Sequence, residues 1–116
     1  MRIGLAACEL SGDQLGASLI EAIRARHPRV EFEGIAGPLM REAGCRPLGR
    51  AEQICVMGLA EVIGHLPRLL RLRRRVFRHF RDNPPDVFVG IDAPDFNLPL
   101  ERRLKRSGIP TVHWVS

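Results

Sequence analysis

The chain has 116 residues, of which 45% are hydrophobic and 27% are charged, and its formal net charge is +5 with the histidines neutral. These values are typical of one soluble globular domain and exclude a disordered chain. The positive charge favours anionic partners, such as phosphates, nucleic acid or an anionic membrane surface, without choosing among them. No apolar stretch approaches the length of a membrane span, so we expect no transmembrane helix.

The cysteines Cys8, Cys45 and Cys55 are far apart and lack a CxxC spacing. This favours a reducing compartment and argues against a zinc site, so we expect no metal and no cofactor. The stretch Leu5–Cys8 resembles a lipoprotein cleavage box, but only Met1–Gly4 precede it. That is too short for a charged segment and a hydrophobic one, so we expect no signal peptide and a cytoplasmic protein.

The hydrophobic pattern predicts alternating strands and helices. The expected strands are Arg2–Ala7, Val30–Ile35, Val87–Ile91 and Pro110–Val115, with an uncertain short strand near Leu48. The expected helices are Asp13–His27, Leu39–Ala43, Met57–Leu66 and Pro67–Arg81 as one kinked helix or two, and Asn97–Ser107. Strand, helix and strand at the start form a βαβ unit, which predicts a Rossmann-like parallel α/β sheet flanked by helices.

The apolar run Val87–Ile91 ends in two carboxylates, Asp92 and Asp95. Ligands of open α/β sheets bind beyond the carboxyl ends of the strands, where an acid can orient a hydroxylated substrate or take a proton from it. We expect Asp92 at the strand end and Asp95 in the loop before the next helix. The alternative is that Asp95 or Asn97 only caps that helix.

A second candidate site is Glu9–Asp13 (ELSGD), where the first strand turns into the first helix. Unpaired N–H groups and the helix dipole attract an anion or a sugar oxygen there, and Gly12 permits a tight turn or close ligand approach. The alternative is that Ser11 or Asp13 simply caps the helix. The spacing is not GxGxxG, so a dinucleotide site is not indicated.

The span Val56–Arg81 combines an apolar stripe with a basic face. The stripe comprises Leu66, Leu69, Leu70, Val76, Phe77 and Phe80, and the opposite face carries Arg68, Arg71, Arg74, Arg75, Arg78 and Arg81. Leu72 lies off this stripe and Arg73 lies in its middle. The span is either a core-facing helix with a solvated basic face or an interfacial helix on anionic lipid. The predicted membrane contacts are Val62, Ile63, Leu66, Leu69, Leu72, Arg71, Arg73 and Arg74.

Several stretches together resemble the N-terminal part of the lipid-A-disaccharide synthases, a family of bacterial inverting glycosyltransferases. They are Glu9–Asp13, Phe32–Pro38, Val56–Val62, Leu66–Arg73, Pro85–Asn97 (PDVFVGIDAPDFN) and Gly108–Ser116. The resemblance implies the N-terminal lobe of a two-lobed (GT-B type) glycosyltransferase. Residues 1–116 would form its acceptor-side lobe, and a C-terminal UDP-sugar-binding lobe would follow, so the chain alone is expected to be inactive.

The resemblance also implies a reaction. The family transfers 2,3-diacylglucosamine from UDP-2,3-diacylglucosamine to 2,3-diacylglucosamine 1-phosphate (lipid X), forms the lipid A disaccharide 1-phosphate and releases UDP without a metal. Asp95 is the expected base, and Asp92 would orient it or the acceptor. The expected substrate-binding residues are Glu9, Ser11, Gly12, Asp13 and Asn97. Peripheral contact with the cytoplasmic leaflet of the inner membrane is also implied.

Two other interpretations stay open from the residues alone. The first is a nucleic-acid-binding module that uses the arginine-rich helix, although the chain has no Tyr and its aromatic residues do not alternate with basic ones. The second is a nucleotide-sugar-binding domain of another two-lobed transferase or epimerase. Because the last predicted strand would leave a bare sheet edge, pairing with a second copy also stays open.

Overall fold

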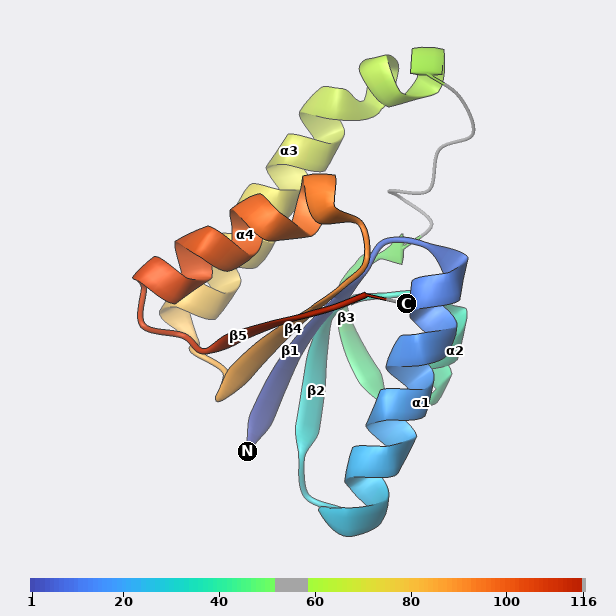
Figure 1. Cartoon of the computed structure of the whole chain (residues 1–116), viewed down its shortest axis with the longest axis vertical. Coiled ribbons are helices and arrows are strands. Elements are labelled where there is room, and N and C mark those ends of the chain that lie inside the picture. Colours follow the sequence, from blue (N-terminus) through green and yellow to red (C-terminus); the bar gives the residue numbers. More distant parts are fainter. Residues whose placement is uncertain (52–58, 116) are drawn as a thin grey trace.

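A computed structural model describes residues 1–51 and 59–115, with the backbone alone for 59–65. Its centre is a parallel sheet of five strands in the order β3-β2-β1-β4-β5 (Figure 1). The strands are β1 (Arg2–Ala7), β2 (Glu31–Ala36), β3 (Cys45–Arg50), β4 (Val87–Ile91) and β5 (Thr111–Trp114). The helices are α1 (Leu10–Arg26), α2 (Pro38–Glu42), α3 (Leu59–Asp82) and α4 (Pro94–Arg106). The predicted parallel α/β sheet is confirmed, and the uncertain strand near Leu48 is β3.

Helices cover both faces of the sheet, so successive residues of the central strands enter two different cores. In β1, Leu5 and Ala7 pack with Ile20 and Met40 on the side of α1 and α2, whereas Ala6 packs on the side of α3 and α4. This double burial explains why β1 and β4 are continuous apolar runs rather than alternating ones.

A glycine in β1 sets how closely α3 approaches the sheet. A Cβ atom on Gly4 would lie 2.9 Å from Phe80 Cζ, so only glycine lets this ring rest on the strand. Phe80 also meets Phe88 of β4 edge to face, with the ring centroids 5.6 Å apart. These contacts fix the C-terminal half of α3 against the sheet.

The other half of α3 extends past the sheet and past the start of α4 (Figure 1). The helix is continuous through Pro67, and its apolar residues divide between two environments. Leu66 and Leu70 are 49% and 44% exposed, whereas Leu72 is 7% exposed in the core with Val76. The expectation that Leu72 lies off the core-facing side and contacts a membrane is therefore wrong. The predicted arginine face is exposed throughout, at Arg68, Arg71, Arg74, Arg75, Arg78 and Arg81.

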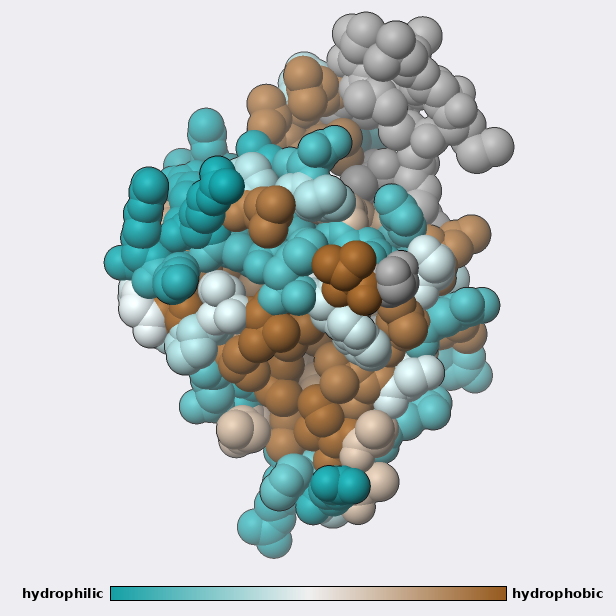
Figure 2. All heavy atoms as spheres, viewed as in Figure 1, coloured by the Kyte–Doolittle hydropathy of each residue, from teal (hydrophilic) through white to brown (hydrophobic). Residues whose placement is uncertain are grey.

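The hydropathy of the surface shows the same division. In Figure 2, hydrophobic side chains gather on the projecting end of α3 and over the visible face of the sheet. The predicted contacts Val62 and Ile63 lie in the α3 backbone, but their side chains are outside the described residues. In the part of the chain that the structure describes, no helix is both long enough and apolar enough to cross a membrane.

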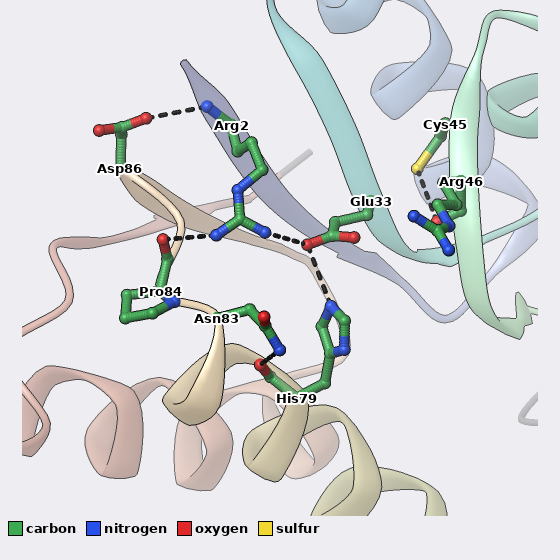
Figure 3. Close-up of polar contacts among 8 residues, drawn as sticks. All are labelled: Arg2, Glu33, Cys45, Arg46, His79, Asn83, Pro84 and Asp86. Atoms are coloured by element: carbon green, nitrogen blue, oxygen red, sulfur yellow. Dashed lines mark hydrogen bonds and ion pairs between the residues drawn. The ribbon is translucent and has the colours of Figure 1, made fainter.

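A polar network holds the C-terminal end of α3 to the sheet at the amino ends of the strands (Figure 3). Glu33 of β2 is buried, and its Oε1 accepts a hydrogen bond from Arg2 Nη1 at 2.9 Å and lies 3.1 Å from His79 Nε2 of α3. Arg2 Nη2 also donates to the Pro84 carbonyl at 2.8 Å. Nearby in β3, burial is the main reason that the pKa of Cys45 rises to about 12. This network lies at the end of the sheet opposite to the candidate site.

Two helix starts differ from the prediction. Helix α1 begins at Leu10 and α4 begins at Pro94, each three residues before the expected start at Asp13 and at Asn97. Asp95 therefore lies in the first turn of α4 and not in a loop before it. The residues before α1 and α4, Glu9 and Ala93, make no side-chain cap, so the usual sequence signal for a helix start is missing at both.

Candidate active site

The two segments that the sequence analysis identified as candidate sites meet at the carboxyl end of the sheet. β1 and β4 are parallel neighbours, with Ala7 beside Ile91 at their carboxyl ends. From this pair the strand order runs to β2 and β3 on one side and to β5 on the other. The β1–α1 turn (residues 8–9) and the β4–α4 turn (residues 92–93) therefore leave the switch point of the sheet, where open α/β folds bind ligands (Figure 1).

The first turn of α1 lies directly across both strands. A Cβ atom on Gly12 would lie 3.4 Å from Ile91 Cγ2 and 3.5 Å from Ala7 Cβ, so the helix packs closely on the paired strand ends. Glu9 and Ser11 are exposed at this end of the sheet, whereas Gly12 is buried. Gly12 thus serves close packing in this structure, and the exposed polar groups beside it are Glu9 and Ser11.

The β4–α4 turn has an unusual backbone. Asp92 and Ala93 have φ angles of +49° and +42°, in the left-handed region that non-glycine residues rarely adopt. The Asp92 N–H donates to the Trp114 carbonyl at 2.9 Å, and the Asn97 N–H donates to the Ala93 carbonyl at 2.9 Å. Such strain costs on the order of 1–3 kcal/mol per residue and is concentrated at functional sites. The turn places the partly buried Asp92 and the exposed Asp95 just beyond the strand end.

Asn97 holds this turn in place from inside. Its side chain is fully buried, and Nδ2 lies 3.2 Å from the Ala6 and Ile91 carbonyls and 3.0 Å from the Asp92 carbonyl. The amide thus ties α4 to the ends of β1 and β4. Asn97 Oδ1 is buried and has no hydrogen-bond partner among the described residues. The predicted direct contact of Asn97 with a substrate gains no support from this buried position.

Asp13 has a different role from the predicted ones. It is 1% exposed, and its two carboxylate oxygens accept hydrogen bonds from the Leu39 and Met40 N–H groups of α2, each at 2.9 Å. Asp13 therefore caps α2 and not its own helix, so the alternative that it caps α1 is wrong, and the predicted contact of Asp13 with a substrate gains no support from this position. Both oxygens are engaged, which leaves Glu9 and Ser11 as the exposed polar side chains of this segment.

A buried acid–histidine pair behind the site was not predicted from the sequence. Glu101 of α4 is 6% exposed, and its Oε2 lies 2.8 Å from His113 Nδ1 of β5. Burial raises the pKa of Glu101, and the contact with His113 partly offsets that rise. Gly90 of β4 makes room for the carboxylate, since a Cβ there would collide with it. The available signal was that Asn97 and Glu101, four residues apart, fall on the apolar side of α4.

Comparisons with known proteins show which proteins this chain is similar to. The family model described as Lipid-A-disaccharide synthetase matches residues 3–116. Proteins named lipid-A-disaccharide synthase from Alkalilimnicola ehrlichii, Vibrio vulnificus and Vibrio cholerae are 61%, 60% and 59% identical over the whole chain. The chain spans about 30% of the length of these curated relatives.

One solved structure has a similar fold at low sequence identity. The crystal structure of CalG4, the calicheamicin glycosyltransferase, aligns with a TM-score of 0.56 and 21% identity. The alignment covers 98% of this chain and 32% of CalG4. At this identity the likeness concerns the fold alone, and it agrees with the parallel α/β fold predicted from the sequence.

The capping role of Asp13 can be tested by its stability cost. In the 116-residue chain, Asp13→Ala leaves two backbone N–H groups of α2 without acceptors, so we expect a loss of about 3 kcal/mol in the free energy of unfolding. Urea denaturation followed by circular dichroism measures this loss. Gln14→Ala, at an exposed position of the same helix, should change it by less than about 0.5 kcal/mol. Equal stability of both variants would contradict the capping role.

The Glu101–His113 pair makes stability depend on pH. Because the folded pKa of Glu101 is raised above its usual 4.5, the folded chain binds its proton more tightly than the unfolded chain. Its contribution is most favourable below pH 4.5 and is lost as pH rises through the folded pKa. Glu101→Gln removes this titration, so its unfolding free energy relative to wild type should increase with pH across that window. A difference that stays constant with pH would show that burial does not perturb Glu101.

Proposed function

This chain belongs to the lipid-A-disaccharide synthetase family, and we propose that it forms the acceptor-side lobe of an inverting glycosyltransferase. The proposed reaction transfers 2,3-diacylglucosamine from UDP-2,3-diacylglucosamine to lipid X and releases UDP. In this proposal a C-terminal lobe that lies outside these 116 residues binds the UDP-sugar. The observation that carries the assignment is the juxtaposition of the β1–α1 and β4–α4 turns at the switch point of the sheet.

In the proposed mechanism Asp95 is the general base. Its carboxylate takes the proton of the acceptor hydroxyl, the hydroxyl oxygen bonds to the anomeric carbon, and the carbon–oxygen bond to UDP breaks with its electron pair leaving on UDP. The position in the first turn of α4 suits this role because the Asp95 side chain is exposed just beyond the end of β4. Asp92, held by the strained turn, orients the acceptor or the base.

The β1–α1 turn supplies the opposite wall of the proposed site. The first N–H groups of α1 have no intrahelical partners, and the residue at the N-cap, Glu9, makes no side-chain cap. They can therefore bind a phosphate or sugar oxygen, together with the exposed Ser11 hydroxyl. Glu9, exposed beside them, can accept a hydrogen bond from a sugar hydroxyl.

We further propose that the projecting half of α3 contacts the cytoplasmic leaflet of the inner membrane. Leu66 and Leu70 are exposed, Leu69 is half-buried, and Arg71 and Arg74 are exposed beside them. Apolar side chains flanked by arginines bind at the surface of anionic lipid, where both acylated substrates reside. The matched relatives give no support to the nucleic-acid alternative, and homo-oligomerisation stays a prediction.

The role of Asp95 can be tested in a chimera in which this chain replaces the matching part of the Alkalilimnicola ehrlichii synthase. Asp95→Asn removes the base, so we expect turnover of UDP-2,3-diacylglucosamine and lipid X to fall by about 100-fold or more. Disaccharide formation is measured with both substrates saturating. Asp82→Asn, which removes an exposed carboxylate at the far end of α3, is the matched control and should stay within about twofold. Wild-type turnover in Asp95→Asn would exclude Asp95 as the base.

If the projecting half of α3 contacts the membrane, substitutions of its exposed leucines should weaken vesicle binding without lowering the stability of the fold. In the same chimera, Leu66→Ser with Leu70→Ser removes exposed apolar surface, so co-sedimentation with anionic vesicles should weaken while the melting temperature stays nearly unchanged. Leu72→Ser is the control at a buried position of the same helix, and it should cost about 3 kcal/mol of stability. If the double variant sediments with vesicles as wild type does, the membrane proposal fails.

A further inference from the structure

Arg73 stands where a charged residue is unexpected. It lies on the core-facing side of α3, between the exposed Leu70 and the buried Val76, and it is half-buried. Its Nη1 donates a hydrogen bond to the Asp95 carbonyl at 3.3 Å, and its Cζ lies 5.9 Å from the centroid of the Phe96 ring. The guanidinium therefore points to the first turn of α4, the turn that carries the proposed base.

The sequence of α4 explains why the Asp95 carbonyl needs an external donor. In an α-helix this carbonyl would accept a hydrogen bond from the N–H of the residue four positions later. That residue is Pro99, which lies inside α4 and has no N–H. The Asp95 carbonyl thus lacks its regular helical partner, and Arg73 Nη1 provides a donor in its place.

Simple helix stabilisation does not account for an arginine at this place. A cation near the amino end of a helix is unfavourable, because the helix dipole is positive there. Methionine at position 73 would fill the same apolar space against Phe96 without that cost. What only the guanidinium supplies is a fixed link between α3 and the backbone of Asp95.

We propose that Arg73 is a positioning residue for Asp95: it replaces the hydrogen-bond donor that Pro99 lacks and thereby fixes the turn that carries the base. This inference rests on the proposed function of Asp95. It changes the predicted role of Arg73 from a lipid contact to an internal link. Because Leu66 and Leu70 lie on the same helix, that link also joins the proposed membrane-facing segment to the reacting groups.

The test uses the chimera described above. Arg73→Met keeps the apolar contact but removes the donor, so we expect kcat to fall by about tenfold or more, since small displacements of a reacting group are costly. The KM values of both substrates and the binding to anionic vesicles should stay within about twofold. Arg73→Lys keeps a donor and should recover part of kcat. Arg78→Met, at an exposed position of α3, is the matched control and should leave kcat unchanged.

The decisive variant is Arg73→Met combined with Pro99→Ala. Alanine restores the N–H that can bond to the Asp95 carbonyl, so the double variant should recover most of the lost kcat. A role in lipid contact or in binding the acceptor phosphate predicts no such recovery. Unchanged kcat in Arg73→Met, a raised KM for lipid X at unchanged kcat, or absence of recovery with Pro99→Ala would each overturn the proposal.

The Asp95→Asn chimera separates this inference from the proposed function. If Asp95→Asn retains wild-type turnover, the assignment of the base is wrong, whatever Arg73 does. If Asp95→Asn loses turnover while Arg73→Met keeps it, the base stands and only the positioning role of Arg73 is wrong. A large fall in the melting temperature of Arg73→Met, together with a proportional loss of active protein, would also overturn the positioning role of Arg73, because a loss of folded protein would then explain the lower activity.

Discussion

The parallel pairing of β1 with β4 is the constraint on which the candidate site depends. Ala7 lies beside Ile91, so the turns that follow these strands leave the sheet at the same height although the two residues are 84 positions apart in the chain. The first turn of α1 rests on both strand ends through Gly12, and Asn97 joins both from the other face. The site is therefore built on a rigid strand pair and not on a single loop.

The β4–α4 turn combines strain with support. Asp92 and Ala93 have positive φ angles, which non-glycine residues rarely adopt. Hydrogen bonds to β5, to α4 and to the Asn97 amide hold them in this conformation. An arrangement of this kind pre-organises the two acids at the cost of local stability. The Glu101–His113 pair links α4 to β5 in the same region. A polar pair therefore lies behind the two acids.

Helix α3 joins three parts of the molecule. Its C-terminal end is held by the Glu33 network at the amino ends of the strands, and its middle packs on the sheet through Leu72, Val76 and Phe80. Its first half projects past the sheet (Figure 1), and Leu66, Arg68 and Leu70 are exposed on it. A long helix that is rigidly seated at one end can expose an apolar segment without unfolding, because the core contacts that hold it are elsewhere.

The sequence by itself determined four of the five strands, all except β3, and the parallel class, because doubly buried strands such as β1 and β4 form continuous apolar runs that local pattern reveals. It also placed Asp92 at the end of its strand. It did not determine that Asp13 caps α2, that Leu72 is buried or that Arg73 meets Asp95. Each of these depends on a partner 22 or more residues away in the chain or on the side-chain environment of a whole helix face. Helix periodicity shows on which side of a helix a residue lies, but it does not show which neighbour covers that side. For Leu72 and Arg73, the packing of α3 against the sheet and against α4 determines the neighbour.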